Sequence, residues 1–245
     1  IAGVLSTIQR AIEAQERVIA AARQVKRSLM ARLFTYGPGA TPAPTKGTEI
    51  GEIPEHWEVV RLGEVAEFAR KLGKQSVINA ALIPFIPMSL LPYDALYITQ
   101  WEVRQVAEIR SGVFVQEGDL LLAKITPCFE NGKQGIVSGL PGGWGYATTE
   151  VIPIRPSSGL DTEYLALYLK MPNIRQSLAG KMEGTTGRQR LPKTVVQSLP
   201  IPFPSLSEQE EIARILQMVD KKIEAEERRK GALQALFKSA LARLM

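Results

Sequence analysis

Histidine and cysteine are almost missing from this 245-residue chain, which contains one of each, His56 and Cys128. A single cysteine excludes an internal disulfide and a cysteine-based metal site, and we expect its thiol to be buried. His56 lies in a predicted loop before Trp57 and has no constellation of metal-ligating or catalytic residues around it in the sequence. We therefore expect a structural role for this histidine.

Long apolar runs are missing as well. No segment approaches the roughly 20 apolar residues of a membrane span, and the first residues lack the basic start and apolar middle of a signal peptide. Apolar residues make up 45% of the chain and charged residues 22%, which is the composition of a folded soluble protein. We expect a cytoplasmic protein that does not associate with a membrane.

Catalytic motifs are the third absence. The chain has no Asn-Pro-Pro-Tyr-like tetrapeptide for amino methylation, no phosphate-binding Gly-x-x-x-x-Gly-Lys-Ser/Thr loop, and no Asp/Glu-x-Lys after a carboxylate in the pattern of a nuclease. The glycine-rich segment 141–145 lacks the strand-then-helix setting of a dinucleotide site, so we expect a turn beside a strand. Two other function classes remain open: a stand-alone nuclease with dispersed ligands, and a coiled-coil scaffold that does not bind DNA.

A repeated segment is what the sequence does contain. Residues 212–245 align with residues 1–34 at a constant offset of 211, without a gap. Ile-Glu-Ala-x-Glu-Arg recurs at 12–17 and 223–228, and Ala-Arg-Leu at 31–33 and 242–244. Two copies of one segment at the two ends indicate a duplicated unit of which about one and a half copies are present.

Both copies are predicted to be long helices. Steps of three and four residues from Leu5 give Ile8, Ile12, Gln15, Ile19, Ala22, Lys26, Leu29 and Leu33; the same frame in the second copy gives Leu216, Val219, Ile223, Glu226, Lys230, Leu233, Phe237, Ala240 and Leu244. This spacing is typical of a coiled-coil seam, here with a polar middle. Each rod would be about 50 Å long at roughly 1.5 Å per residue. If the two copies pair within one chain, they must be antiparallel.

The fold class that follows is α+β: a globular, mixed α/β domain on an antiparallel two-helix coiled-coil stalk. We divide the chain into a first helix at 1–36, a globular domain at 37–206 and a closing helix at 207–245. Within the domain we expect a short strand leading into a short helix from residue 52, helices at 161–171 and 172–183, and a polar loop at 184–192. We also expect an extended edge segment at 199–204, whose alternate prolines exclude a central strand. Short apolar runs predict strands at 83–88, 119–125, 135–138 and 150–154.

Charge is unevenly distributed in the globular domain. The net charge of the chain is +5. Residues 49–67 are acidic, with Arg61 as the one base, whereas residues 164–204 are basic, with Glu183 as the one acid. One face of this domain should therefore attract polyanions.

Four stretches, in this order and framed by the repeated helices, resemble the specificity subunit of type I restriction-modification enzymes. They are IPEHWEVVRLGEV at 53–65, GDLLLAKITPCFENGKQGIV at 118–137, GTTGRQRLP at 184–192 and LPIPFPSLSEQEEIARIL at 199–216. The resemblance implies a non-catalytic protein that selects the DNA sequence for a larger complex. Each subunit of this family has two target recognition domains, each reading one half of a split site, held apart by two helices.

The resemblance also implies partners. Methyltransferase subunits dock on the helices and supply the S-adenosylmethionine chemistry, a translocating and cleaving subunit joins them, and this chain itself binds no cofactor and no metal. The chain looks like a spacer helix, a second recognition domain and a closing helix, so we expect the parent protein to continue upstream into another such domain. Without one, the chain would have to self-associate through its helices.

Three loops are candidate contacts to double-stranded DNA, because paired donors and acceptors read base edges while cations and hydroxyls bind phosphate. The first comprises Thr185, Thr186, Arg188, Gln189 and Arg190; the second Lys124, Thr126, Asn131 and Lys133; the third Arg70, Lys71, Lys74 and Gln75. Asn131-Gly132 is equally compatible with a plain hairpin turn. The target sequence does not follow from such an inventory.

Overall fold

A computed structural model describes residues 2–68, 82–109, 111–185 and 187–242 of the chain. The residues group into two compact units. We call the first the rod, which comprises Ile1–Thr45 and Glu211–Met245, and the second the head, which comprises Lys46–Glu210. None of the described helices combines the length and apolarity needed to cross a membrane.

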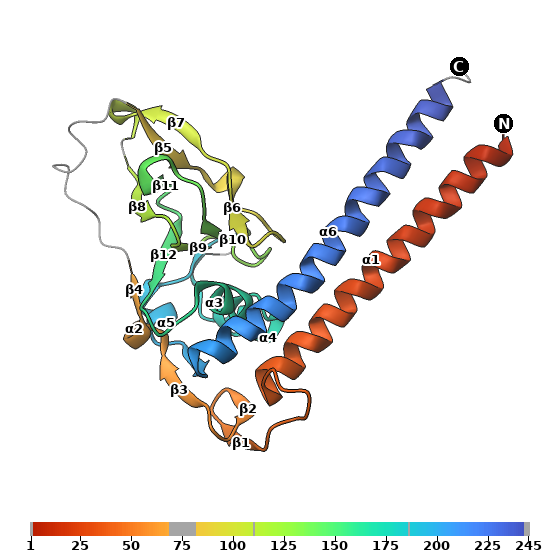
Figure 1. The fold of residues 1–245 in the computed structure, drawn as a ribbon. Helices are drawn as coiled ribbons and strands as arrows, with labels where there is room; N and C mark the ends of the chain where they lie inside the picture. Colours follow the sequence, from red (N-terminus) through yellow and green to blue (C-terminus); the bar gives the residue numbers. More distant parts are fainter. Residues whose placement is uncertain (1, 69–81, 110, 186, 243–245) are drawn as a thin grey trace. The chain divides into compact units, whose positions relative to one another are not determined.

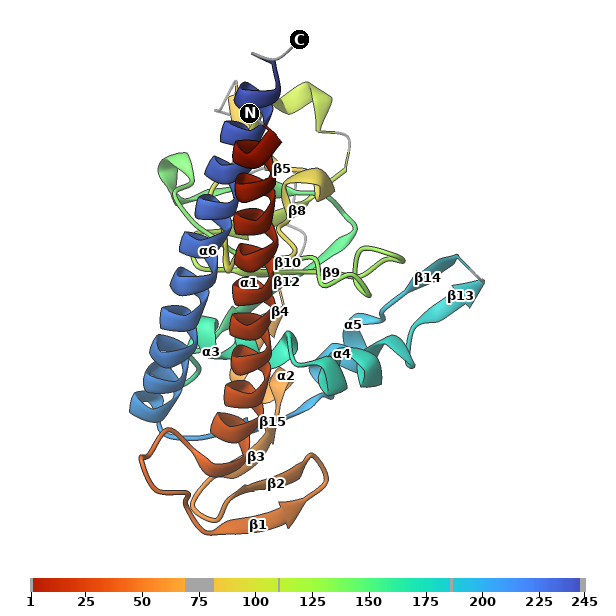
Figure 2. The same cartoon turned by 90° about the vertical axis from the view of Figure 1, so that its right-hand side faces the viewer.

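The rod consists of two long antiparallel helices, α1 (Ala2–Tyr36) and α6 (Leu206–Ala242) (Figures 1 and 2). Helix α1 ends where the sequence predicts, because Gly37 adopts a positive φ of 78° and its N–H bonds to the carbonyl of Leu33 at 3.0 Å. A glycine in this conformation is a common way to end a helix. Helix α6 begins after Ser205, whose N–H and hydroxyl both donate to Glu208. The Ser205–Glu208 pair follows the Ser-x-x-Glu pattern that is common at helix starts.

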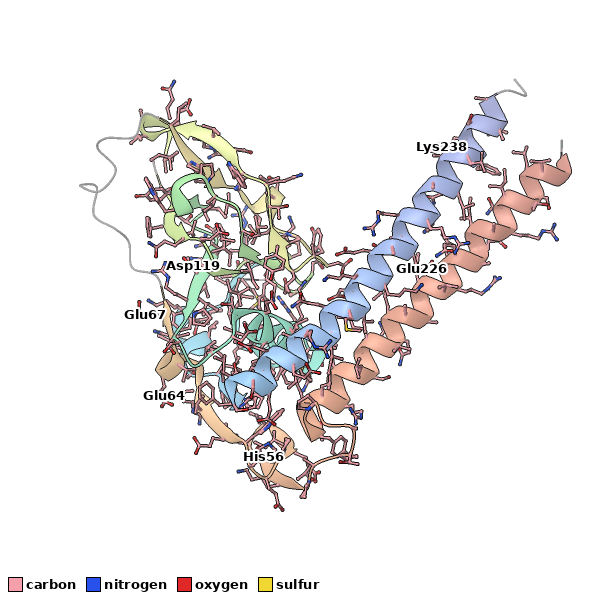
Figure 3. All side chains as sticks on the ribbon, in the orientation of Figure 1. His56, Glu64, Glu67, Asp119, Glu226 and Lys238 are labelled. Carbon is pink, nitrogen blue, oxygen red and sulfur yellow. The ribbon has the colours of Figure 1, made fainter. Side chains whose placement is uncertain are left out.

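The predicted seam is confirmed. Ile8, Ile12 and Ile19 on α1 and Ile223 on α6 are each less than 10% exposed. The polar middle of the seam is paired across the two helices: Gln15 Nε2 donates to Glu226 Oε2 at 2.6 Å, Lys26 pairs with Asp220 at 2.6 Å, and Lys230 pairs with Glu16 at 2.8 Å. Figure 3 labels Glu226, which projects from α6 toward α1. Hydrogen bonds from Lys222 and then Gln15 hold the pKa of Glu226 below its ordinary value.

Gln15 and Glu226 are equivalent positions of the two repeat copies, since they are 211 residues apart. Residues that correspond in two copies can meet across an antiparallel pair only close to a local two-fold axis. The duplication in the sequence is therefore expressed as an approximate two-fold symmetry of the rod, with the axis near this contact.

The head contains two larger sheets. The five-stranded sheet has the order β4-β12-β9-β10-β6, in which only the β10–β6 pair is parallel; its strands are β4 (Ala66–Phe68), β6 (Tyr97–Ile98), β9 (Leu120–Ala123), β10 (Gln134–Val137) and β12 (Val151–Pro156). The four-stranded sheet has the order β7-β5-β11-β8, with β5–β11 parallel; its strands are β5 (Leu82–Ile86), β7 (Glu102–Gln105), β8 (Val113–Gln116) and β11 (Trp144–Ala147).

A hydrophobic core lies between these sheets. One cluster of buried side chains takes Val115 from the four-stranded sheet and Leu121, Val137 and Val151 from the five-stranded sheet. Cys128 packs against this cluster and is partly buried. Just before β9, the central strand of the five-stranded sheet, Asp119 is only 1% exposed and accepts two hydrogen bonds from Arg155, at 2.7 and 2.8 Å. This pair ties the start of β9 to β12.

Smaller elements complete the head. Helices α3 (Thr162–Leu169) and α4 (Pro172–Ala179) begin as predicted, α3 with Asp161 as its N-cap. Strand β15 (Pro200–Phe203) pairs with β3 (Glu58–Arg61) in a two-stranded sheet, which confirms the expected edge position of the proline-rich segment. Further elements among the described residues are β1 (Thr45–Thr48), β2 (Gly51–Pro54), α2 (Leu62–Val65), α5 (Lys193–Gln197) and 3-10 turns at Met88–Leu90, Val106–Glu108 and Pro141–Gly143.

His56 has the structural role expected of it. Its Nε2 lies 2.8 Å from Glu208 Oε1, and Trp57 Nε1 donates to the same carboxylate at 3.1 Å. Partial burial acts to raise the pKa of Glu208, but the hydrogen bonds from His56, Trp57 and Ser205 together hold it below its ordinary value. A shared carboxylate thus fixes the loop at Trp57 against the first turn of α6, within the head unit.

Candidate nucleic-acid interface

The segment predicted as a polar loop at 184–192 is instead a β-hairpin of β13 (Glu183–Thr185) and β14 (Arg188–Arg190), paired Glu183 to Arg190 and Thr185 to Arg188. The prediction missed these strands because none of their side chains is apolar. Gly184 has a φ of 127°, and a Cβ there would lie 2.6 Å from the carbonyl oxygen of Arg188, so only glycine fits. The hairpin protrudes from the head beyond α4 and α5 (Figure 2), with Thr185, Arg188 and Arg190 exposed and Gln189 partly buried.

The second candidate loop, between β9 and β10, is joined to this hairpin by main-chain hydrogen bonds. Thr126 N–H donates to Gln189 O at 3.1 Å, Leu191 N–H donates to Lys124 O at 2.7 Å, and Ile125 bridges to Arg190. Two loops more than 50 residues apart in the sequence therefore form one continuous surface. Of its predicted residues, Asn131 is exposed, whereas Lys124 and Thr126 are partly buried.

Lys133 lies differently from what the sequence predicts for a DNA contact. Its side chain is turned inward, is only 7% exposed, and donates from Nζ to the carbonyl of Met88 at 2.7 Å. The ammonium also lies 4.8 Å from the ring centre of Tyr93. In this conformation the lysine fixes the end of the β9–β10 turn and presents no charge to a ligand.

Arg175 of α4 supports the same turn from within the head. It is 8% exposed, and its guanidinium donates to Phe129 O at 2.9 Å and to Gln134 Oε1. The guanidinium also lies over the Phe129 ring, 4.7 Å from its centre. Burial lowers the pKa of Arg175 to about 10. The sequence placed this arginine in the basic segment 164–204 without indicating that its charge is internal.

The third candidate loop, with Arg70, Lys71, Lys74 and Gln75, lies outside the described residues, as does Thr186 of the hairpin.

A residue that the sequence did not single out is Glu150, in the turn before β12. Its carboxylate pairs with Arg190 at 3.0 Å. No sequence signal marks an acid that meets an arginine 40 positions away.

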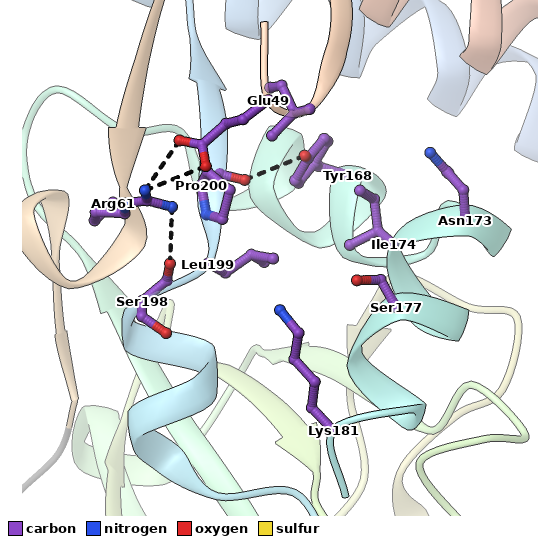
Figure 4. Close-up of a pocket in the computed structure, with 11 residues that line it drawn as sticks. Glu49, Arg61, Tyr168, Asn173, Ile174, Ser177, Lys181, Ser198, Leu199 and Pro200 are labelled. Atoms are coloured by element: carbon purple, nitrogen blue, oxygen red, sulfur yellow. Dashed lines mark hydrogen bonds and ion pairs between the residues drawn. The ribbon is translucent and has the colours of Figure 1, made fainter.

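A separate hollow of about 350 Å³ lies between β3, α3, α4 and the segment before β15 (Figure 4). Arg61 in its wall is paired with Glu49 and also donates to Ser198 O, while Lys181 extends into the space. The hollow is polar and open to solvent. Lys181 is the one cation without an ion-pair partner among the described lining residues, so the hollow suits a small anion at most. Across the described ranges, no group of three or more His, Cys, Asp or Glu residues could hold a metal ion.

Comparison with known proteins bears on this surface. Residues 54–235 match the family described as the type I restriction modification DNA specificity domain. The chain belongs to this family. The match begins within β2 and extends into α6, so it covers both joined loops and a large part of the closing helix.

Relatives named as type I specificity subunits agree with this assignment, and a solved structure shares the fold. The EcoAI specificity subunit of Escherichia coli is 38% identical over 163 residues, which cover 66% of this chain and 27% of that protein. The MjaVIII specificity subunit of Methanocaldococcus jannaschii is 26% identical over 260 residues, covering all of this chain and 58% of that protein. The crystal structure of the HsdS subunit from Thermoanaerobacter tengcongensis matches 98% of this chain and 55% of its own, with 17% identity and a TM-score of 0.62. The chain thus spans from about a quarter to just over half of these proteins.

Proposed function

We propose that this chain is the part of a type I specificity subunit that reads one half of a split DNA target. The observation that carries the proposal is the joining of the β13–β14 hairpin to the β9–β10 turn, which gathers Arg188, Arg190 and Asn131 on neighbouring, protruding segments. Arginine forks suit guanine and phosphate, and an amide suits adenine. The head carries 16 bases and 18 acids, so a basic edge on it requires this kind of local concentration.

The rod supports the half-site interpretation. A spacer with local two-fold symmetry at Gln15 and Glu226 would relate a second head to this one by rotation, so that two heads approach the duplex in opposite directions. A rod of about 50 Å corresponds to about one and a half turns of DNA at roughly 34 Å per turn. In our proposal the target is therefore two short half-sites separated by bases that are not read.

Helix α1 carries a second stripe that fits the expected protein partners. Steps of three and four residues outside the seam give an outer stripe of small or apolar side chains: Val4, Thr7, Ala11, Ala14, Val18, Ala21, Val25 and Ser28. Val4, Val18 and Val25 are 59%, 46% and 58% exposed. A heptad-spaced apolar stripe suits a helix of another protein. We assign it to the methyltransferase subunits, which would hold S-adenosylmethionine, with the translocating and cleaving subunit joining through them; a second copy of this chain is the competing occupant.

Binding of the purified chain to a randomised DNA duplex pool, followed by sequencing of the bound fraction, tests the proposal. We expect enrichment of one short motif and no methylation or cleavage by the chain alone. Replacing Arg188 with alanine should weaken binding by about 1–3 kcal/mol, at one base if it contacts a base edge and on all sequences if it contacts phosphate.

Lys193→Ala is the matched control, because it removes an exposed cation of α5 outside the hairpin. Failure of the unaltered chain to bind DNA would leave the scaffold alternative standing, and cleavage by the chain alone would favour the nuclease. Equal affinity and motif in the Arg188 and Lys193 variants would remove the hairpin from the contact surface.

A further inference from the structure

Glu150 is an acid on a surface that should attract DNA. It lies in the turn before β12, where its carbonyl accepts the N–H of Lys124 at 3.0 Å and its own N–H donates to Thr148 Oγ1 at 3.3 Å. These two contacts fix its main chain beside the β9–β10 turn. Its carboxylate Oε1 accepts a hydrogen bond from Arg190 Nη2 at 3.0 Å.

The other carboxylate oxygen, Oε2, is shielded from solvent and has no hydrogen-bond partner among the described residues. A shielded acceptor without a donor destabilises the fold, and a pair in which the arginine is 66% exposed stabilises it little. A contribution to the stability of the fold therefore does not explain why an acid occupies position 150. Its charge also opposes the approach of a polyanion, so general attraction of DNA does not account for it either.

The two arginines of β14 differ in a way that Glu150 explains. Arg188 and Arg190 are two residues apart and so lie on the same side of the strand. Arg188 has no side-chain partner among the described residues, and its guanidinium is free to follow a phosphate. Arg190 is held through one terminal nitrogen, which leaves its other guanidinium donors available to a ligand.

We propose that Glu150 is a positioning residue that holds Arg190 for bidentate recognition of a guanine edge and lowers the affinity of this surface for DNA of other sequence. The inference rests on the proposed function, because it presumes that the hairpin contacts DNA. A guanidinium fork matches the two acceptors that guanine presents in the major groove, O6 and N7. A carboxylate beside the arginine discourages the alternative contact to a phosphate by charge repulsion.

The test compares Glu150→Ala and Glu150→Gln in the full chain, by binding to the enriched duplex, to each of its single-base variants and to an unrelated duplex. Both variants lose the charge, so both should bind the unrelated duplex several-fold more tightly than the unaltered chain at low salt. Glutamine keeps an acceptor oxygen for Arg190 and alanine does not. The preference for guanine at one position should therefore fall roughly tenfold in Glu150→Ala and by a smaller factor in Glu150→Gln.

Glu183→Gln is the charge-matched control. Glu183 is exposed and lies opposite Arg190 in the hairpin register, but no ion pair joins the two. This variant should gain affinity for the unrelated duplex and keep the base preference. Arg190→Ala should lose the preference at the same base. Adding Glu150→Ala to the Arg190→Ala variant should cause no further loss of base preference. This second comparison does not require the Glu150→Ala single variant to be stable enough for binding measurements.

The outcomes separate this inference from the function beneath it. If the unaltered chain prefers one sequence but Glu150→Ala keeps every base preference, Glu150 has no positioning role and the proposed function stands. If the unaltered chain shows no base preference, the proposed function and this inference both fail. A parallel loss of affinity for all duplexes in Glu150→Ala, matched by a lower melting temperature, would assign Glu150 a purely structural role and overturn the inference.

Discussion

The Lys26–Asp220 pair of the rod and Arg175 of the head differ in how far they are shielded from water. At the margin of the rod's seam, Lys26 and Asp220 remain 16% and 24% exposed, and water can replace either partner. In the head, Arg175 is 8% exposed and is held by a main-chain carbonyl and an amide oxygen. A partly exposed pair such as Lys26–Asp220 contributes little to stability, whereas loss of Arg175 in a dry interior leaves Gln134 Oε1 without a hydrogen bond. Burial of apolar side chains should therefore contribute most to the stability of the rod. Hydrogen bonds to buried polar groups should contribute most to the stability of the β9–β10 turn.

The largest effect should come from the apolar seam of the rod. Replacing Ile12 and Ile223 together with aspartate removes two buried branched side chains, each contributing roughly 1.5–3 kcal/mol, and places two carboxylates where water is excluded. We expect the free energy of unfolding, measured by urea titration with circular dichroism, to fall by about 3–6 kcal/mol.

Ser6→Asp with Ala20→Asp is the control for this change, because both positions are exposed on α1 and aspartate is a poor helix former at all four sites. A similar loss of stability in the two double variants would mean that the seam does not hold the helices together.

A smaller but still large effect is expected at the buried arginine of the head. Arg175→Met keeps an unbranched apolar stem and removes the donors to Phe129 O and Gln134 Oε1. Gln134 Oε1 loses its donor, whereas Phe129 O still accepts the N–H of Gly132 at 2.9 Å. One orphaned acceptor costs about 1–3 kcal/mol, so we expect a net loss of about 1–3 kcal/mol in the unfolding free energy.

Gln176→Met, at an exposed position of the same helix, should leave the stability unchanged. Arg175→Lys restores the charge but not both hydrogen bonds, and should lie between the two. An Arg175→Met variant as stable as Gln176→Met would show that the network around Phe129 does not stabilise the turn.

The same contrast explains what the sequence predicts well. The rod is defined by contacts three and four residues apart, repeated in both copies, so its frame, its polar middle and its antiparallel pairing all follow from residue spacing. The apolar runs that became β9, β10 and β12 are also local, and their positions agree with prediction within two residues at each end. Strands β6, β7 and β8 escaped prediction because they are short and only partly buried, and their pairing is decided by distant segments.

The candidate site is predictable only in its residue types. Arg188 and Arg190 stand out as cations in a polar, glycine-containing segment, and both lie on the hairpin. The inward turn of Lys133 depends on a carbonyl 45 residues away, and the pairing of Arg190 depends on Glu150, 40 residues away. Contacts of this kind leave no periodic mark, which is why the union of two loops into one surface emerges only from the fold.

The smallest effect on stability should come from the outer stripe of α1. A substitution there compares the buried seam and the exposed stripe of the same helix. Val18 is 46% exposed and lies outside the seam, so Val18→Glu should change the unfolding free energy by no more than about 0.5 kcal/mol. The same substitution should abolish co-elution with the methyltransferase subunits in size-exclusion chromatography, because a carboxylate buried against a partner helix is strongly unfavourable.

Ala20→Glu introduces the same charge two residues away, at an exposed position outside both stripes, and should leave the complex intact. If Val18→Glu instead converts a dimer of this chain into monomers and methyltransferase binding persists, the stripe is a self-association surface. Full retention of both assemblies would mean that the partners use another face of the rod.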